Sequence, residues 1–354
     1  MKSTITKYLT SINLTFALCT NLYAEDASQT SEIQENQDTQ IQIDHKSDSV
    51  SNIFWQSTYA TMCGMNAGRV SVDSLSDRAF NIEGGALGLC LYQKDNIEKR
   101  GFHMDGTGFY TGISAEAASR YKVGFHFVAQ NTHAMANASH NEVTTDYLSL
   151  GSQWQINCFQ GKLILIGNYL YTLGNHQINP TDSQRVEDCC DAFESQTIGN
   201  SISCYFPIKA KTNHRLTVTP FVCYQAFSSR LNKFKEQSAH LQTLLTSDIF
   251  LDVSLPFGLH NALVFHGCCP SVWELQVAYK PTVFRTVPVV DSIVVADNSS
   301  WTSSPTDVSY HAFSINFRNN IQLLKHLHIN CNYQCDISSS TCNHYLLAGG
   351  KLSF

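Results

Sequence analysis

Apolar and polar side chains alternate with a period of two residues along most of the chain from about residue 80 onward. Successive side chains of a β-strand point to opposite faces, so each such segment is expected to be a strand with one apolar and one polar face. The pattern is clearest in 148–158 and noisier around 80–92, 194–210 and 247–258. In 148–158 the apolar face consists of Leu148, Leu150, Trp154, Ile156 and Cys158, with Ser152 as its polar member, and the other face of Ser149, Gly151, Gln153, Gln155 and Asn157.

This alternation predicts twelve strands. Most have the length of about 9–11 residues that a tilted strand needs to cross a bilayer, whereas strands of globular proteins are typically about 5–6 residues long. The predicted strands are approximately 80–92, 106–118, 121–132, 146–158, 162–174, 196–208, 214–226, 247–258, 271–284, 309–322, 326–336 and 344–354.

The connections between these segments alternate between long and short. Outer-membrane barrels have short turns on one side of the membrane and long loops on the other, so the alternation favours such a barrel over a soluble sandwich. The long predicted connections are 93–105, 133–145, 175–195, 227–246, 285–308 and 337–343; the short ones lie near 119–120, 159–161, 209–213 and 323–325, and 259–270 is intermediate.

Only helices and closed barrels pair every backbone N–H and C=O group within the hydrocarbon core of a membrane. The sequence has no run of about eighteen apolar residues, which a spanning helix would require. The predicted apolar faces carry no charge, and the opposite faces hold Glu116, Glu274, Lys280, Arg318 and Lys351. The sequence therefore predicts an all-β protein, a transmembrane up-and-down antiparallel β-barrel of about twelve strands.

The last predicted strand ends in an aromatic residue. Phe354 shares a face with Leu352 and Leu346, while Ser353 and Lys351 lie on the other face. A final amphipathic strand ending in an aromatic residue is what the outer-membrane barrel assembly machinery recognises. We therefore predict Phe354, Leu352 and Leu346 to form the assembly signal and the assembly machinery to be a partner.

Three segments precede the predicted barrel of residues 80–354. Residues 1–24 have a positive start, a weakly apolar stretch and an alanine at the cleavage position, which predicts a signal peptide. Residues 25–50 are rich in Gln, Asp and Ser, a composition that predicts a disordered polar linker. Residues 51–79 form a predicted entry or plug segment, since its large apolar residues would share one side of a short helix within 51–75.

Composition narrows the class of protein. Charged residues make up 15% of the chain, against about 25% in a typical soluble domain, and 20 Phe and 15 Tyr suit a membrane barrel. The 23 basic residues against 29 acidic ones give a net charge of −6, which argues against a nucleic-acid partner.

Several short motifs resemble the autotransporter barrel domain of the chlamydial polymorphic outer membrane proteins, and the resemblance spans about residues 51–354. It rests on Trp-Glu-Leu-Gln-Val-Ala-Tyr-Lys-Pro at 273–281, Ser-Trp-Thr at 300–302, the strand pair at 106–114 and 122–127, Asn-Ile-Phe-Trp at 52–55 and Gly-Lys-Leu-Ser-Phe at 350–354.

The resemblance implies a twelve-stranded barrel that secretes or displays an N-terminal passenger, with a helix from the entry segment in the pore. The family's passenger is built on repeated Gly-Gly-Ala-Ile and Phe-x-x-Asn motifs. The chain has one related copy of each, at 84–87 and 313–316, both inside the predicted barrel. We therefore expect a barrel without a recognisable passenger.

Disulfide bonding is the chemistry that the cysteines of this chain could supply. The chain has 13 cysteines, one of them in the predicted leader. The adjacent pairs Cys189–Cys190 and Cys268–Cys269 are not expected to bond internally, because a disulfide needs Cα atoms about 5.5 Å apart. Each is expected to bond elsewhere in the chain or to another molecule, as is Cys342. The resemblance adds other cysteine-containing envelope proteins as partners, because the chlamydial envelope is held together by disulfide cross-links.

No enzyme motif or cofactor motif is present, and no spacing singles out a catalytic dyad. Histidines and cysteines do crowd the last two strands, at His326, His328, Cys331, Cys335, Cys342 and His344. A zinc site needs converging ligands. Cys331 and Cys335 share the predicted lipid face and His328 points inward, so the sequence predicts neither a metal site nor an enzyme.

The predicted function is that of an autotransporter-like barrel in the bacterial outer membrane, acting as a translocator or structural surface protein with exposed loops. Membrane lipid is then its immediate environment. Two alternatives stay open: a porin-like diffusion channel, and an adhesin that acts through its loops.

Overall fold

The computed structural model of the protein describes residues 38–67, 80–95, 101–117, 120–137, 142–179, 191–209, 216–232, 234–235, 243–247, 249–267, 269–286, 290–294 and 300–354. The predicted signal peptide, the first part of the predicted linker and residues 68–79 of the entry segment lie outside these ranges.

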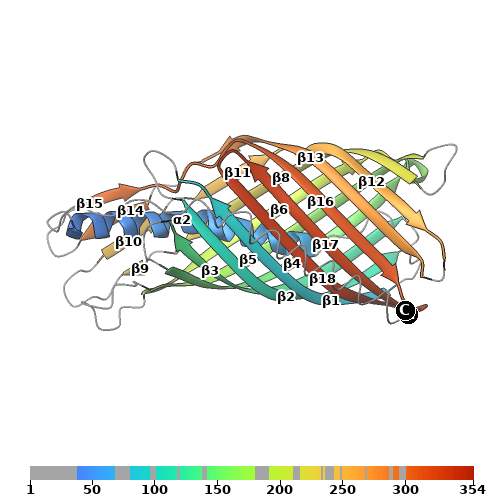
Figure 1. The fold of residues 1–354 in the computed structure, drawn as a ribbon, viewed down its shortest axis with the longest axis horizontal. Coiled ribbons are helices and arrows are strands. Elements are labelled where there is room, and N and C mark those ends of the chain that lie inside the picture. Colours follow the sequence, from blue (N-terminus) through green and yellow to red (C-terminus); the bar gives the residue numbers. More distant parts are fainter. Residues whose placement is uncertain are drawn as a thin grey trace, which may run out of the picture. The chain divides into compact units, whose positions relative to one another are not determined.

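Within the described residues the chain forms a closed antiparallel barrel of twelve strands, as predicted (Figure 1). Strands that follow one another around the barrel are paired, and pairing of β1 with β18 closes it. Two of the twelve strands are interrupted, because β7 continues β6 and β12 continues β11. The barrel strands are β1 (Phe80–Gln93), β2 (Phe102–Ala117), β3 (Tyr121–Ala136), β4 (Glu142–Cys158), β5 (Leu163–Asn179), β6 (Asp191–Tyr205), β7 (Ile208–Lys209), β8 (Leu216–Leu231), β11 (Phe250–Ser254), β12 (Phe257–Phe265), β13 (Ser271–Arg285), β16 (His311–Gln322), β17 (Leu327–Ser338) and β18 (Thr341–Ser353).

The break between β11 and β12 falls at Leu255 and Pro256. Proline has no N–H to donate to a ladder, but its carbonyl still accepts from the N–H of Cys223 at 2.7 Å, which keeps the chain in the sheet. The strand predicted at 247–258 therefore extends from Phe250 to Phe265, and the intermediate connection predicted at 259–270 shrinks to 266–270.

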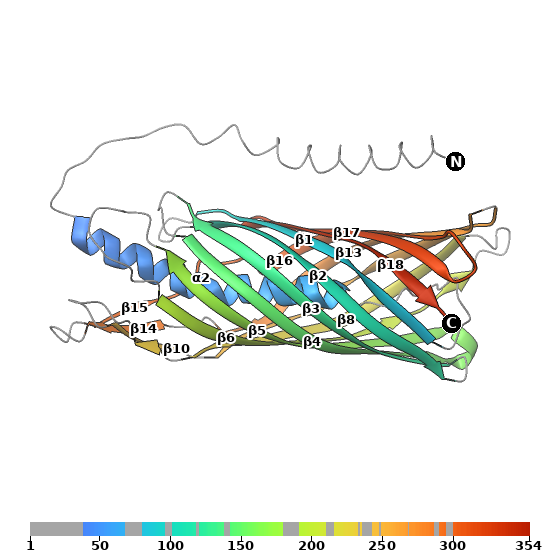
Figure 2. The ribbon, with the colours of Figure 1, turned by 90° about the horizontal axis from the view of Figure 1, so that it is seen from below.

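The two ends of the barrel differ in their connections (Figure 2). At one end, here called the turn end, the strands are joined through 118–120, 159–162, 210–215, 266–270 and 323–326. At the other, the loop end, the connections are 94–101, 137–141, 180–190, 232–249 and 286–310. The predicted alternation holds for the connections 94–101, 180–190, 232–249 and 286–310, whereas the predicted long connections 133–145 and 337–343 are short. Within 337–343, Ser339 and Ser340 alone join β17 to β18, because the Ser338 hydroxyl accepts from the Thr341 N–H at 2.9 Å and closes a tight turn.

The two longest loop-end connections contribute a second sheet. It consists of β9 (Phe234–Lys235), β10 (Thr243–Ser247), β14 (Val290–Val294) and β15 (Ser300–Ser303), in the order β15-β14-β10-β9. These two connections are thus joined to each other by backbone pairing between β10 and β14.

The two faces of the barrel strands differ as the alternation predicts. On β4 the outward Leu148 and Leu150 are 54% and 63% exposed, whereas the inward Ser149 and Gln153 are each 2% exposed. All five charged residues predicted to avoid the lipid face alternate with outward apolar neighbours and are buried or half-buried. The barrel therefore presents an apolar outer surface to the membrane.

Helix α2 (Asp38–Ala67) lies inside the barrel over its C-terminal half (Figures 1 and 2). It is longer than the helix predicted within 51–75, and it includes residues 38–50, which were predicted to be disordered. Once a helix is nucleated, each further residue gains a hydrogen bond that offsets the cost of ordering it, so a polar segment can extend a helix that is anchored elsewhere. Among the described residues no helix is both long and apolar enough to cross a membrane.

Candidate functional site: a lumen occupied by a helix

The C-terminal half of α2 is enclosed by the barrel wall. Every residue from Ser51 to Ala67 is buried except Asn66, which is half-buried. Residues on all sides of the helix, including Ser51, Ser57 and Cys63, have no exposed surface. A helix buried all round must satisfy its polar groups within the protein, and the contacts of α2 with the wall show how this is done.

At the loop end the connection between β13 and β16 folds onto the helix. The indole N–H of Trp55 donates to the carbonyl of Thr306 at 3.1 Å, and the Thr306 N–H donates to Asn52 Oδ1 at 3.0 Å. The guanidinium of Arg285 lies 4.7 Å from the centre of the Trp55 ring, an arrangement that favours a cation over the ring face. Arg285 is itself paired with Asp252 at 2.7 Å.

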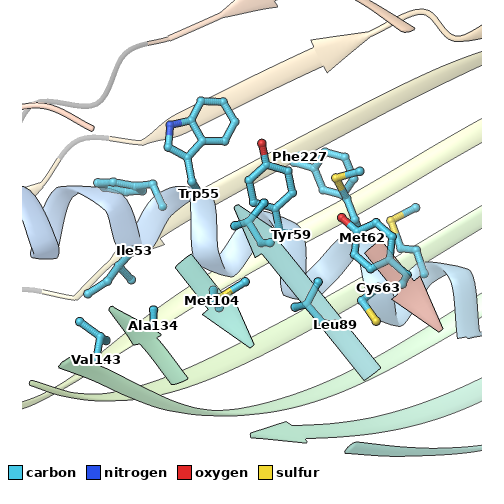
Figure 3. Close-up of a cluster of buried hydrophobic side chains, with 14 of the residues drawn as sticks. Ile53, Trp55, Tyr59, Met62, Cys63, Leu89, Met104, Ala134, Val143 and Phe227 are labelled. Carbon is cyan, nitrogen blue, oxygen red and sulfur yellow. The ribbon is translucent and has the colours of Figure 1, made fainter. Parts of the chain in front are cut away.

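Along the middle of the helix the wall is apolar (Figure 3). Leu89, Met104 and Phe227 are buried in one cluster with Tyr59 and Cys63 of the helix. This explains the noisy alternation at 80–92. Leu87, Leu89 and Leu91 point inward and pack in this cluster, so both faces of β1 are apolar. The expectation of one apolar and one polar face on each strand is therefore wrong for β1, where the wall faces the helix.

Polar groups of the helix also find partners on the wall. The Ser57 hydroxyl lies 3.1 Å from the hydroxyl of Ser195 and 3.4 Å from that of Tyr147. Thr58 and Thr61 instead donate to helix carbonyls one turn earlier, each at 2.8 Å. These bonds give the short polar side chains hydrogen-bond partners within the protein.

Near the C-terminal end of the helix, glycines let helix and wall approach closely. A Cβ atom on Gly199 of β6 would lie 2.6 Å from Met65 Sδ and 2.9 Å from Thr61 Cγ2. The side-chain amide of Asn168 donates to the carbonyl of Met65 at 2.8 Å, and that of Gln130 donates to the carbonyl of Ala60 at 3.0 Å. The wall thus supplies hydrogen bonds to helix carbonyls directly.

Beyond Ala67, toward the turn end, the lumen becomes polar. A cavity there is lined by Asn66 and Ala67 of the helix and by Glu83, Lys351 and Arg318 of the wall. On the wall of this part of the lumen, ion pairs join neighbouring strands, with nitrogen–oxygen distances of 3.4 Å for Lys122 and Glu116 and 3.7 Å for Arg318 and Glu274. A further pair, Lys280 and Asp336 at 3.8 Å, lies beside Met62 of the helix. The lumen is therefore packed around the helix and charged beyond it.

The predicted assembly residues all lie on the outer face. Phe354 and Leu352 are exposed and Leu346 is half-buried. The N–H of Phe354 donates to the carbonyl of Phe80 at 2.9 Å, and the two rings are 6.3 Å apart. Phe354 thus extends the pairing of β18 with β1, at the position where the barrel closes.

The predicted disulfide residues are only partly described. Cys189, Cys190 and Cys268 lie outside the described residues, Cys269 is exposed in the turn between β12 and β13, and Cys342 lies in β18 rather than in a loop. Each of the nine described cysteines is a thiol rather than half of a disulfide, and the cross-linking role stays a prediction. His328 points inward, as expected, and so diverges from Cys331 and Cys335 on the outer face. The side chains of Cys342 and His344, however, converge with that of Cys335.

A family model decides which class of barrel this is. The autotransporter β-domain model matches residues 84–334. The chain belongs to the autotransporter β-domain family.

Solved translocator structures agree at the level of the fold. The translocator domain of NalP from Neisseria meningitidis aligns over 88% of this chain and 98% of that one, with 13% identity and a TM-score of 0.57. The transport unit of AIDA-I from Escherichia coli aligns over 84% and 99%, with 10% identity and a TM-score of 0.59.

Curated relatives of this autotransporter β-domain confirm the resemblance to the chlamydial polymorphic outer membrane proteins. The probable outer membrane protein pmp15 of Chlamydia pneumoniae is 25% identical over 86% of this chain and 32% of its own length. The probable outer membrane protein PmpE of Chlamydia trachomatis is 26% identical over 75% of this chain and 28% of its own length. The autotransporter β-domain thus spans about a third of the length of these relatives, and it is a protein of the outer membrane.

The close approach at Gly199 gives a test of the helix position. Replacing Gly199 with leucine should prevent α2 from seating, because the added side chain would occupy the space of Met65 and Thr61. Overpacking of this kind costs about 1–3 kcal/mol. We expect Cys63, which has no exposed surface, to become reactive toward a maleimide in the folded variant.

The matched control is Gly267→Leu, since a Cβ atom at Gly267 would meet nothing within 4 Å. This variant should leave Cys63 as unreactive as in the parent protein, measured by mass spectrometry of the labelled peptide. Strong labelling of Cys63 in the parent protein, equal to that in Gly199→Leu, would show that the helix does not occupy the lumen.

Proposed function

We propose that this barrel is a translocator in which α2 closes the lumen after the chain on its N-terminal side has passed through. The observation that carries the proposal is the complete burial of residues 51–65 within the wall. A segment enclosed in this way excludes water and solutes from the part of the lumen that it fills. We further propose that the domain has a transport and structural role without catalysis.

The direction of the helix supports this proposal. Asn52 and Trp55 bind Thr306 at the loop end, whereas Met65 is held by Asn168 deeper in the barrel. After the helix, the chain enters the barrel wall at Phe80, where β1 begins at the turn end. The chain therefore runs through the lumen with its N-terminal side toward the loop end, as required if that side emerges at the cell surface.

A porin-like channel is the competing function, and the packed lumen argues against it. The adhesin alternative gains one observation. The loop-end sheet of β9, β10, β14 and β15 gives two connections an ordered backbone, which would present a defined surface at the cell exterior. Display by these loops is compatible with a closed translocator, so it is an additional role of the same domain.

A covalent lock tests the proposal. The hydroxyl oxygens of Ser57 and Ser195 are 3.1 Å apart, so cysteines at both positions should form a disulfide, which needs Cβ atoms about 3.5–4.5 Å apart. In planar bilayers the oxidised Ser57→Cys, Ser195→Cys protein should stay at the low conductance of the parent protein. A protein lacking residues 51–67 should conduct more.

The control pair is Ser57→Cys with Ser203→Cys, because Ser203 lies on the same strand much nearer the turn end and should not cross-link. Two results would contradict the proposal. One is high conductance in the locked protein, which would mean that the seated helix leaves an open channel. The other is unchanged conductance after removal of 51–67.

We also propose that the outer-membrane assembly machinery recognises the last strand through Phe354, Leu352 and Leu346. The support is their shared outward face and the position of Phe354 at the β1–β18 closure. Phe354→Ala should lower the fraction of chains that reach the folded, membrane-inserted state, measured by the mobility of unboiled protein on SDS gels. Phe159→Ala is the control, because Phe159 is also exposed, at 75% against 59% for Phe354, but lies in the turn between β4 and β5. Equal folded fractions for the two variants would contradict recognition through Phe354.

A further inference from the structure

Three metal-binding side chains meet on the outer face of the last hairpin. Cys342 and His344 are two residues apart on β18 and so point to the same face. In the pairing of β17 with β18, Cys335 is directly opposite His344. The two sulfurs and a ring nitrogen all lie within 4.8 Å of one another. We refer to Cys335, Cys342 and His344 as the hairpin triad.

The distances are close to those of a zinc site. Zinc binds thiolate sulfur at about 2.3 Å and imidazole nitrogen at about 2.0–2.1 Å, which in a tetrahedral site separates neighbouring ligand atoms by about 3.6 Å. Cys342 Sγ and His344 Nε2 are already 3.3 Å apart. Small side-chain rotations therefore suffice to bring the three atoms around one ion.

A second observation points to the same site. The hydroxyl of Tyr333 lies 2.8 Å from Nδ1 of His344, and the two rings are stacked with their centres 6.1 Å apart. Metal-binding histidines almost always use their other ring nitrogen in a hydrogen bond, which fixes the ring and the position of its proton. Here Tyr333 holds Nδ1, so Nε2 is the nitrogen that faces the cysteine sulfurs.

The site lies where the strands leave the apolar part of the membrane. Across β18, His344 pairs with Cys90 of β1, and Cys90 pairs in turn with Asp105 of β2. Asp105 is paired with His103 at 2.7 Å, and its side chain is 62% exposed. A carboxylate and an imidazole on the outer face are costly in hydrocarbon and common at its boundary. The short turn at Ser339 and Ser340 also leaves the triad uncovered by a long loop.

We propose that the hairpin triad binds one zinc ion through Cys335 Sγ, Cys342 Sγ and His344 Nε2, with the fourth position open to water. Two thiolates and an imidazole form a donor set that suits zinc and disfavours magnesium or calcium. Binding displaces the two thiol protons to solvent. Since β18 is the strand that closes the barrel against β1, the ion fixes the hairpin next to this closure.

The experiment uses the full chain, purified in detergent, with thiols kept reduced and zinc alone as the probe. We expect one zinc per chain in competition with a chromophoric chelator. Cobalt at the same site should give the charge-transfer absorption of thiolate ligands. Cys342→Ser and His344→Ala should abolish this binding. Tyr333→Phe should weaken it by about 10-fold, because the hydrogen bond that supports His344 is lost.

Cys331→Ser is the matched control, because Cys331 lies on the outer face of β17, two periods of the alternation away from Cys335. It should bind zinc as the parent protein does, and unboiled gel mobility should show that every variant is folded. The proposal is overturned if reduced parent protein binds no zinc, or if the triad variants bind it equally well. A disulfide between Cys335 and Cys342 in protein taken directly from membranes would also overturn it.

Discussion

Pairing of the backbone in hydrocarbon is the constraint on which the rest of this structure depends. Each unpaired N–H or C=O group in the bilayer core costs several kcal/mol, and no described helix here can cross the membrane. A sheet meets the constraint only if it has no edge, and the continuous pairing of β1 with β18 from Asn81 to Gln93 removes it. Even the proline at position 256 is accommodated within one strand, with its carbonyl still paired.

Closure of the sheet creates a lumen, and the lumen raises a second packing problem. Side chains that point inward from long strands do not by themselves fill a barrel of this size. In this autotransporter β-domain the lumen is filled in two ways, by a helix and by paired charges. Helix α2 packs against leucine, methionine and phenylalanine near the loop end, and paired charges occupy the lumen beyond Ala67. The same helix that satisfies the packing of the wall also blocks the path through it, so stability and closure of the pore have one origin.

Some of this could be predicted from the sequence and some could not. The two-residue period at 148–158 correctly assigns the faces of β4, because lipid and lumen impose opposite demands on alternate side chains. The same period does not assign the faces of β1, because its inward residues Leu87, Leu89 and Leu91 are apolar where they meet the helix. The helical state of residues 38–50 was missed because composition describes a segment in isolation. The hairpin triad was missed because its members come together through the register of β17 and β18, which depends on a two-residue turn that the sequence pattern did not reveal.

The orientation of side chains relative to lipid is the claim that everything else requires, and it can be measured directly. A benzophenone amino acid would be placed in turn at Leu148 and Leu150, and at Ser149 and Gln153, in the protein folded in its native membrane. Irradiation at the first two positions should cross-link to lipid, and at the other two to the protein itself, since β4 alternates between exposed and buried positions. Cross-links to protein at Leu148 and Leu150 would mean that these side chains pack in a dry interior, and would contradict a membrane-spanning barrel.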